Sequence, residues 1–266
     1  MHAFVARLLI VGLIAMIGTV PVQDMRAAPA VPPPATQPER LVDIKLVLNT
    51  LTAVADSHIA AMANALVVAS VTQDVRSLNW EKMKPLLAAI QERFGPAVVW
   101  YAQPDGTYYT VDVGLTDKNL KDRAYFPKVM AGETAIGELV ISKSTGSNTV
   151  IVATPIQVQG QVVGLLGASV YLDHLVDNIK KIAPLPADAV FYALDAQGRI
   201  ALHTQEGLIF QEAMQLGSPT LAEAVKQMLA NQEGGVTYEF AGGQQQAVYQ
   251  TSPLTGWKFA IRFPAE

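Results

Sequence analysis

The stretch Ala97–Val113, AVVWYAQPDGTYYTVDV, decides the fold class. Two apolar segments whose residues alternate with a period of two flank Pro104–Gly106, which has the composition of a tight turn. The stretch therefore predicts a β-hairpin. Alternation along it puts Tyr101 and one of the two tyrosines Tyr108 and Tyr109 on the same face.

Upstream of this hairpin the apolar residues recur at spacings of three and four, the period of an α-helix. The segment from Glu39 lacks Gly and Pro and predicts one long helix that extends to about Val75. Asn79 is a suitable N-cap for a second helix over Trp80–Phe94. Residues 39–95 are therefore expected to form a helical stalk.

Downstream of the hairpin a polar loop leads to a short helix from about Tyr125, and three more strands follow. They are predicted at GELVISKSTG, NTVIVATPIQV and QVVGLLGASVYL. Five antiparallel strands with an inserted helix make residues 96–172 a first α+β module.

The same order of elements then recurs. Val190–Ala193 (VFYA) resembles Val99–Ala102 (VWYA), and a Gly-containing turn, a helix and three strands follow again. We predict a second module over 188–266 and a connector over 173–187. The fold class is α+β: a long N-terminal helix followed by two tandem modules, each an antiparallel sheet with flanking helices.

The N-terminus has the order of a secretory signal: a basic start at Arg7, an apolar run over Leu8–Val20 and small residues up to Ala30. The apolar run is shorter than the roughly 20 residues that a membrane-spanning helix needs. We predict a cleaved signal peptide over 1–30, with an uncleaved N-terminal membrane anchor as the alternative. Residues 31–38 form a proline-rich spacer.

The composition argues against several function classes. The net charge is −4, or −5 once residues 1–30 are removed, so nucleic acid is a poor candidate partner. The 266 residues include no cysteine, so an exported chain of this kind has no disulfides. No P-loop, no nucleophile elbow and no histidine pair with metal-ligand spacing is present. We therefore expect no catalytic residues, no metal and no cofactor, with an exported hydrolase as a remote alternative.

The motifs together resemble a double Cache domain. They are D-R-x-Y-F at Asp122–Phe126, S-K-x-x-G at Ser142–Gly146, and T-P-I followed by G-x-V-V-G-x-L-G over Thr154–Gly167. Double Cache domains are extracytoplasmic sensor modules of two PAS-like units on a helical stalk. The resemblance implies that the first, membrane-distal-type module binds a small molecule. The chain stops at Glu266 after the last predicted strand, so we expect no transmembrane signalling part of its own.

The resemblance implies that Arg123 points into the pocket of the first module and holds a carboxylate, with Tyr125 and Phe126 as shielding rings. Arginine suits this role because its planar guanidinium can bind both carboxylate oxygens. The alternative is that Arg123 pairs with Asp122 or Asp117 at the surface.

Family members that bind α-amino acids carry two acidic residues for the ammonium group. The corresponding positions here hold Lys128 and Ser169. Because a bound ammonium without a counter-charge is costly, the expected ligand is a small carboxylate of the acetate, propionate, lactate or pyruvate class. Lys143 is either a second positive charge in the site, which would allow a dicarboxylate, or an exposed loop lysine.

Further candidate ligand contacts are Tyr101 and Tyr109 from the hairpin, Thr154 and Ser169. The expected function is an exported, periplasmic or secreted solute-binding sensor that passes its bound state to a membrane receptor, kinase or transporter. The alternative is an adaptor subunit of a receptor or transporter without a small ligand. A homodimer through the N-terminal helix is a further expectation.

Overall fold

Three helices open the part of the chain that the computed structural model describes, which comprises residues 37–182, 185–205 and 207–265. They are α1 (Gln37–Ser70), α2 (Gln73–Arg76) and α3 (Trp80–Phe94). The predicted signal peptide (1–30) and residues 31–36 of the predicted spacer lie outside the described residues.

Side-chain caps set the boundaries of these helices. Asn79 Oδ1 accepts a hydrogen bond from the Lys82 amide at 3.3 Å, which confirms it as the N-cap of α3. The prediction that α1 reaches Val75 is wrong, because α1 ends at Ser70. Thr72 Oγ1 accepts from the Val75 amide and thereby starts α2 as a separate helix.

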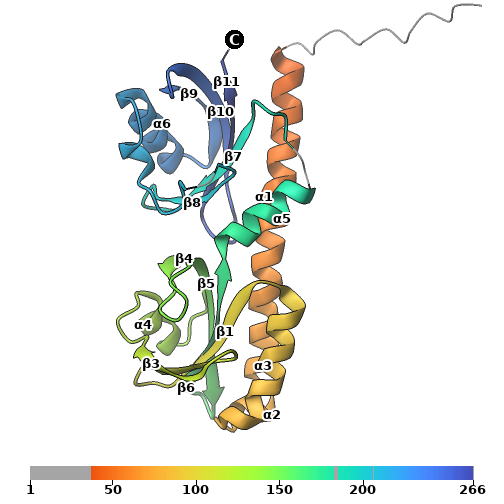
Figure 1. Ribbon diagram of the computed structural model, residues 1–266, viewed down its shortest axis with the longest axis vertical. Coiled ribbons are helices and arrows are strands. Elements are labelled where there is room, and N and C mark those ends of the chain that lie inside the picture. The colour runs from red at the N-terminus through yellow and green to blue at the C-terminus, as the bar shows by residue number, and fades with distance from the viewer. Residues whose placement is uncertain (1–36, 183–184, 206, 266) are drawn as a thin grey trace, which may run out of the picture. The chain divides into compact units, whose positions relative to one another are not determined.

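Helix α1 is a core helix of the described unit. It contacts β5 and β6 of one sheet and β10 and β11 of the other (Figure 1). Its fully buried residues follow the helical period, at Leu48, Leu51, Ala55, Ile59, Met62 and Leu66. Within the described residues, Ile44–Ser70 is also the one segment long and apolar enough to cross a membrane by length and composition.

The first sheet has six strands in the order β3-β2-β1-β6-β5-β4, with all neighbours antiparallel. Its strands are β1 (Ala97–Ala102), β2 (Thr107–Thr110), β3 (Gly114–Asn119), β4 (Ala135–Ile141), β5 (Asn148–Val158) and β6 (Gln161–Tyr171). Helix α4 (Tyr125–Met130) lies between β3 and β4 in the chain.

The sequence predicts a polar loop at the residues that form β3, and this prediction is wrong. Its sequence, GLTDKN, is polar and mostly exposed, so it lacks the alternation that predicts a strand. An edge strand needs backbone pairing on one side only. Here β3 pairs with β2 through Tyr109↔Leu115 and Thr107↔Asn119.

The second sheet has five antiparallel strands in the order β8-β7-β11-β10-β9. They are β7 (Val190–Leu194), β8 (Ile200–His203), β9 (Glu233–Phe240), β10 (Gly243–Thr251) and β11 (Lys258–Pro264). The 3-10 helix η1 (Ala213–Gln215) and helix α6 (Pro219–Ala230) lie between β8 and β9, and α5 (Leu172–Ile182) follows β6 directly. The α+β fold class with two antiparallel sheets is confirmed.

Both sheets have the same strand order once the edge strand β3 is set aside. In each, the first and last strands of the module lie side by side, as β1 with β6 and β7 with β11. Each module also inserts a helix, α4 or α6, at the same point of the order. The tandem repeat predicted from the sequence is therefore present in the topology.

Each sheet has two apolar faces. One face of both sheets joins a single core along α1, which includes Val99 and Val152 from the first sheet and Phe191 and Phe259 from the second. The other face of the first sheet packs under α4 and that of the second under α6, in two separate clusters. We call these two outer faces the α4 face and the α6 face.

Candidate functional site

The α4 face of the first sheet is built around Trp100. Its indole lies flat against Gly167, which is its register partner on β6, and its Nε1–H donates to Ser169 Oγ at 3.3 Å. The Tyr125 ring is tilted against the indole, with ring centroids 6.0 Å apart. Tyr108 and Phe126 complete this buried aromatic cluster.

Replacing Gly167 by alanine is expected to lower the free energy of unfolding by about 2 kcal/mol, because overpacking a filled core forces neighbours out of place. A Cβ atom at this position would lie 2.1 Å from a ring carbon of Trp100. Urea denaturation measures the effect. Gly235→Ala is the matched control, since a Cβ there has 3.7 Å to its nearest neighbour. Equal stability of Gly167→Ala and wild type would contradict this packing.

Arg123 precedes α4 and reaches the same region. Its Nη2 donates to the Ile141 carbonyl at 2.6 Å, which fixes the guanidinium against the end of β4. Its Nε is buried and has no hydrogen-bond partner. Among the described residues it is the single buried side-chain nitrogen or oxygen in that state. An unpaired buried donor costs free energy, so this atom is a natural place for an acceptor to bind.

The positive charge of Arg123 affects the pKa of Tyr125 in the aromatic cluster. Burial raises the pKa of the Tyr125 phenol well above its ordinary value, and the positive charge of Arg123 opposes that shift. Tyr108, Asp122 and Glu138 act on the same phenol in the raising direction. The guanidinium therefore acts on the hydroxyl end of the cluster.

The carboxylates next to Arg123 in sequence are paired elsewhere. Asp122 forms a salt bridge with Lys143, and Asp117 forms one with Lys118 at 3.0 Å. The sequence left open that Arg123 pairs with Asp122 or Asp117 at the surface. The structure shows neither pair, because each carboxylate has a lysine partner instead. Lys143 also donates to the Asn119 carbonyl at 2.7 Å, so its ammonium group is already satisfied outside the aromatic cluster.

The described residues contain no group of three His, Asp or Glu side chains that could hold a metal ion. The α4 face combines a guanidinium held by a backbone carbonyl, an unpaired buried donor and a set of buried aromatic rings.

Comparison with known proteins identifies the family. The Cache domain model dCache_1 matches residues 40–266. The chain belongs to the Cache domain family. Cache domains are extracytoplasmic sensor domains of chemoreceptors and related receptors, and they bind ligands rather than catalyse reactions.

Three similar proteins illustrate the relationship. The methyl-accepting chemotaxis protein PscA of Pseudomonas syringae is 27% identical over 165 residues, covering 59% of this chain and 24% of PscA. The chain thus spans about a quarter of the length of that relative. Among solved structures, Methyl-accepting Chemotaxis protein X has a TM-score of 0.70 at 17% identity, covering 86% of this chain and 100% of that one. The ligand-binding domain of the Pseudomonas aeruginosa amino acid chemoreceptor PctB, in complex with L-Arg, has a TM-score of 0.68 at 16% identity, covering 85% and 96%. At these identities the two structures support the Cache fold alone.

Within this Cache fold, the structure brings some predicted site residues together and separates others. Arg123, Tyr125, Phe126 and Ser169 lie together at the α4 face. Thr154 does not join them: its register partner Leu166 belongs to the α1 core, and its hydroxyl lies 3.5 Å from that of Thr134.

Tyr101 and Tyr109 also lie away from Arg123. Tyr109, and not Tyr108, pairs with Tyr101 across the hairpin, but both rings face α1 and α3, where Tyr109 stacks on Trp80 at 5.2 Å. Trp100 and Tyr108 occupy the α4 face instead. Alternation predicts that Tyr101 shares its face with one of the two tyrosines. It does not predict which one, or which face Arg123 reaches, because both faces of this sheet are buried and apolar.

Glu138 is an acidic residue of the α4 face that the sequence analysis did not single out. It is paired with Ile151 of the α4-face cluster, its side chain is 29% exposed, and its carboxylate lies 4.0 Å from Lys128 Nζ. A bulge next to Gly137 shifts the register of β4 at this point, and a bulge of this kind cannot be located from alternation alone.

Proposed function

We propose that this Cache protein is an exported sensor domain that reversibly binds a small carboxylate at the α4 face, with Arg123 as the anchor. The observation that supports the proposal best is the buried Nε of Arg123, which lacks a partner next to a cluster of aromatic rings. A carboxylate oxygen would satisfy this donor and neutralise a charge that neither Asp117 nor Asp122 neutralises.

The surroundings of Arg123 favour a tight contact. The Ile141 carbonyl holds Nη2, so the guanidinium is oriented before a ligand arrives and loses little side-chain entropy on binding. Tyr125, Phe126 and Trp100 are each at most 4% exposed and exclude water from the cluster. Low local polarity strengthens a hydrogen bond between opposite charges.

Arg123→Ala is expected to weaken carboxylate binding about thirty-fold or more, since it removes one partner of a shielded charge pair. The measurement is a thermal-shift and calorimetric titration of the full chain with two- to four-carbon acids. Arg93→Ala, which removes an exposed arginine at the end of α3, is the matched control. Unchanged affinity in Arg123→Ala, or the absence of any stabilising acid for wild type, would count against the site.

The ligand class within the carboxylates depends on Glu138. The absence of acids at Lys128 and Ser169 favours a monocarboxylate without an amine, and the pairing of Lys143 with Asp122 argues against a dicarboxylate. Glu138 favours a second candidate, an α-amino acid, because it places a carboxylate on the same face as Tyr125. The PctB domain in complex with L-Arg shows that this fold accommodates such ligands.

Glu138→Gln separates the two classes. If the ligand is a simple acid, removing this negative charge leaves its affinity unchanged or raises it. If the ligand is an α-amino acid, the variant loses affinity because the ammonium group loses its counter-charge. Titration of propionate against alanine in wild type and variant gives the answer.

The location and partners form part of the same proposal. A cleaved signal peptide over 1–30 would release the chain into the periplasm, and N-terminal sequencing of the mature protein tests this. A membrane receptor, kinase or transporter would read the bound state. Dimerisation through α1 stays a prediction, and Leu46, Val68 and Val71 are apolar residues that α1 and the turn after it leave exposed.

A further inference from the structure

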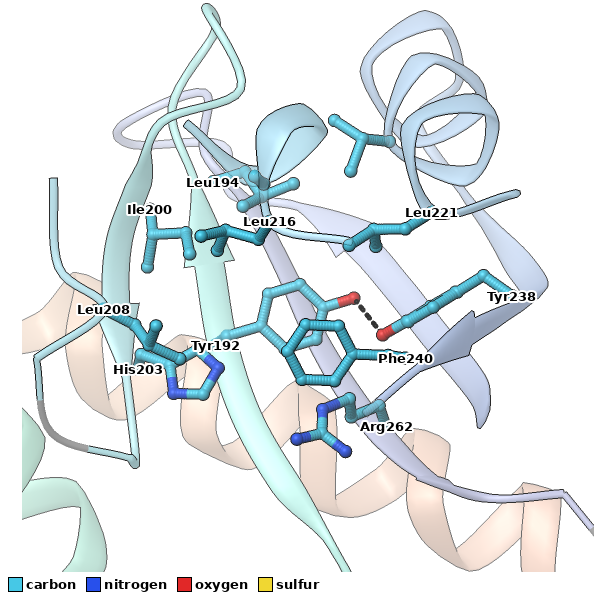
Figure 2. Close-up of a pocket in the computed structure, with 12 residues that line it drawn as sticks. Tyr192, Leu194, Ile200, His203, Leu208, Leu216, Leu221, Tyr238, Phe240 and Arg262 are labelled. Carbon is cyan, nitrogen blue, oxygen red and sulfur yellow. Dashed lines mark hydrogen bonds between the residues drawn. The ribbon is translucent and has the colours of Figure 1, made fainter. Parts of the chain in front are cut away.

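The second module has a partly open cavity of about 40 Å³ under its own helix (Figure 2). Twelve residues from the sheet, η1, α6 and the loops between them line it. Aliphatic side chains, among them Leu194, Ile200, Leu216 and Leu221, lie on one side. Since one water molecule needs roughly 10–15 Å³ of such space, the cavity has room for about three or four water molecules. Bonded atoms lie closer together than neighbouring waters do, so this space is enough for about four or five non-hydrogen atoms of one small molecule.

The polar groups of this cavity lie together on its other side. The Tyr192 and Tyr238 hydroxyls are 3.3 Å apart and hydrogen-bonded, and Arg262 lies beneath the ring of Phe240 with its guanidinium carbon 5.1 Å from the ring centroid (Figure 2). His203 stacks against Tyr192 with ring centroids 6.0 Å apart. None of the twelve lining residues is Asp or Glu, so the polar side has a net positive charge.

The tautomer of His203 adds a donor to this side. Its Nδ1 accepts a hydrogen bond from the Gln205 amide at 3.0 Å, which assigns the proton of the neutral ring to Nε2. Burial, together with the positive charges of Arg262 and Lys180, lowers the pKa of His203 to about 4. The ring is therefore neutral at pH 7 and offers an N–H rather than a lone pair.

Arg262 is held by neutral hydrogen-bond partners. Its Nη1 donates to Gln245 Oε1 at 2.9 Å and its Nη2 to Gln205 Oε1 at 3.2 Å, and both acceptors are neutral amides. The salt bridges found among the described residues do not include Arg262. The other arginine of this module, Arg199, is paired with Asp195 at 2.8 Å. Arg262 is thus oriented by its neighbours without being neutralised by them.

The repeat shows that this charge is specific to the second module. The match of VFYA with VWYA read from the sequence is one residue out of register, because Phe191 lies in the α1 core and Tyr192, like Trp100, lies on the outer face. Trp100 pairs with Gly167 in the first sheet, and Tyr192 pairs with Ala260 in the second. Two residues further along the last strand, on the same face, the first module has Ser169 and the second has Arg262. The two outer faces therefore have corresponding aromatic residues but different polar groups.

We propose that the second module is a separate binding site for a small monocarboxylate of two or three carbons. The carboxylate binds Arg262, and its short apolar tail lies among Leu194, Ile200 and Leu221. The cavity volume limits the ligand to two or three carbons. The guanidinium of Arg262, whose hydrogen-bond partners are neutral, favours an anion, and the aliphatic wall excludes a second charged group on the ligand. This site is independent of the α4 face of the first module.

The test uses the full chain carrying Arg123→Ala, so that binding at the α4 face does not contribute. The probe is propionate, and the readout is the methyl NMR signal of Ile200, which lines the cavity. We expect a saturable shift of this signal with propionate and none with propionamide, which has the same shape without the charge. Adding Arg262→Gln is expected to weaken binding about thirty-fold or more, and adding Arg93→Gln instead is expected to leave it unchanged.

A second variant tests the cavity without touching the charge. Ala213→Leu fills the cavity from η1 and is expected to abolish the Ile200 shift, whereas Ala230→Leu makes the same substitution at an exposed position of α6 and is expected to preserve it. An Ile200 signal that stays unmoved by propionate, or that moves equally in Arg262→Gln, would overturn the proposal. Either result leaves the Arg123 site untouched, because that site is measured in the chain with Arg123 intact.

Discussion

Trp257→Ala is expected to lower the free energy of unfolding by about 3–5 kcal/mol, the range observed when a buried aromatic side chain is truncated in a core. Trp257 is 1% exposed and belongs to the core along α1. Its ring packs at an angle on Phe259, with centroids 6.2 Å apart. The cost is high because little of the surrounding structure is free to collapse into the space left behind.

Trp257 also connects the two sheets. Its Nε1–H donates to the Gly137 carbonyl of β4 at 3.1 Å, although the residues are far apart in sequence. In the turn before it, Ser252 Oγ donates to Asp56 of α1 at 2.8 Å. The second module is thereby joined to the first sheet and to the long helix at one place. We therefore expect both modules to unfold in a single transition.

Two variants make this prediction specific. Trp257→Phe keeps one ring in the core but loses the N–H and the rest of the indole, so it should cost about 2 kcal/mol, less than Trp257→Ala. Trp80→Ala removes a partly exposed tryptophan at the start of α3 and should cost less than Trp257→Ala. Urea denaturation of the four proteins measures the order. Two separate transitions in wild type, or equal stability of the alanine and phenylalanine variants, would refute the shared core.

The fold could be predicted from the sequence because most elements have strong local signals. Helix α3 occupies the predicted residues Trp80–Phe94, since a capping Asn79 and a terminal Gly95 define its ends. The order of elements along the second module follows from its resemblance to the first, whereas the order of strands within each sheet was not predicted. Strand β3 could not be predicted, because its residues are polar and its pairing depends on β2 alone.

The candidate site was harder to predict than the fold. The D-R-x-Y-F motif identified Arg123 and the rings of α4, which are neighbours in sequence. The residues that meet them come from distant strands, and their face depends on the three-dimensional position of α4. This explains why the sequence points to Tyr101 rather than Trp100, and why it does not single out Arg262. In the sequence, Arg262 is an ordinary polar residue of an alternating strand, and its charge becomes unusual only when its amide partners and the cavity are known.

Acidification is expected to destabilise the protein through His203, by roughly 2–3 kcal/mol between pH 7 and pH 4.5. The pKa of His203 is lowered from 6.5 to about 4 in the folded protein, first by burial and then by the positive charges of Arg262 on β11 and Lys180 on α5. Between about pH 6.5 and pH 4, His203 is therefore mostly protonated in the unfolded chain and mostly neutral in the folded protein. Stability from this group is fully present above pH 6.5 and falls as the pH drops towards 4, at about 1.4 kcal/mol per pH unit.

The contribution of His203 can be isolated by comparing pH profiles. His58 has a pKa lowered by burial and acts in the same direction, whereas burial raises the pKa of Asp56, which acts in the opposite direction. Both effects remain in His203→Asn, whose side-chain oxygen can accept the Gln205 amide in place of Nδ1. The difference between the wild-type and variant profiles, measured by urea denaturation at pH 7 and pH 4.5, should equal the predicted loss. Parallel profiles would mean that His203 is protonated as readily in the folded protein as in the unfolded chain, and that its ring is not held in a buried, positively charged setting.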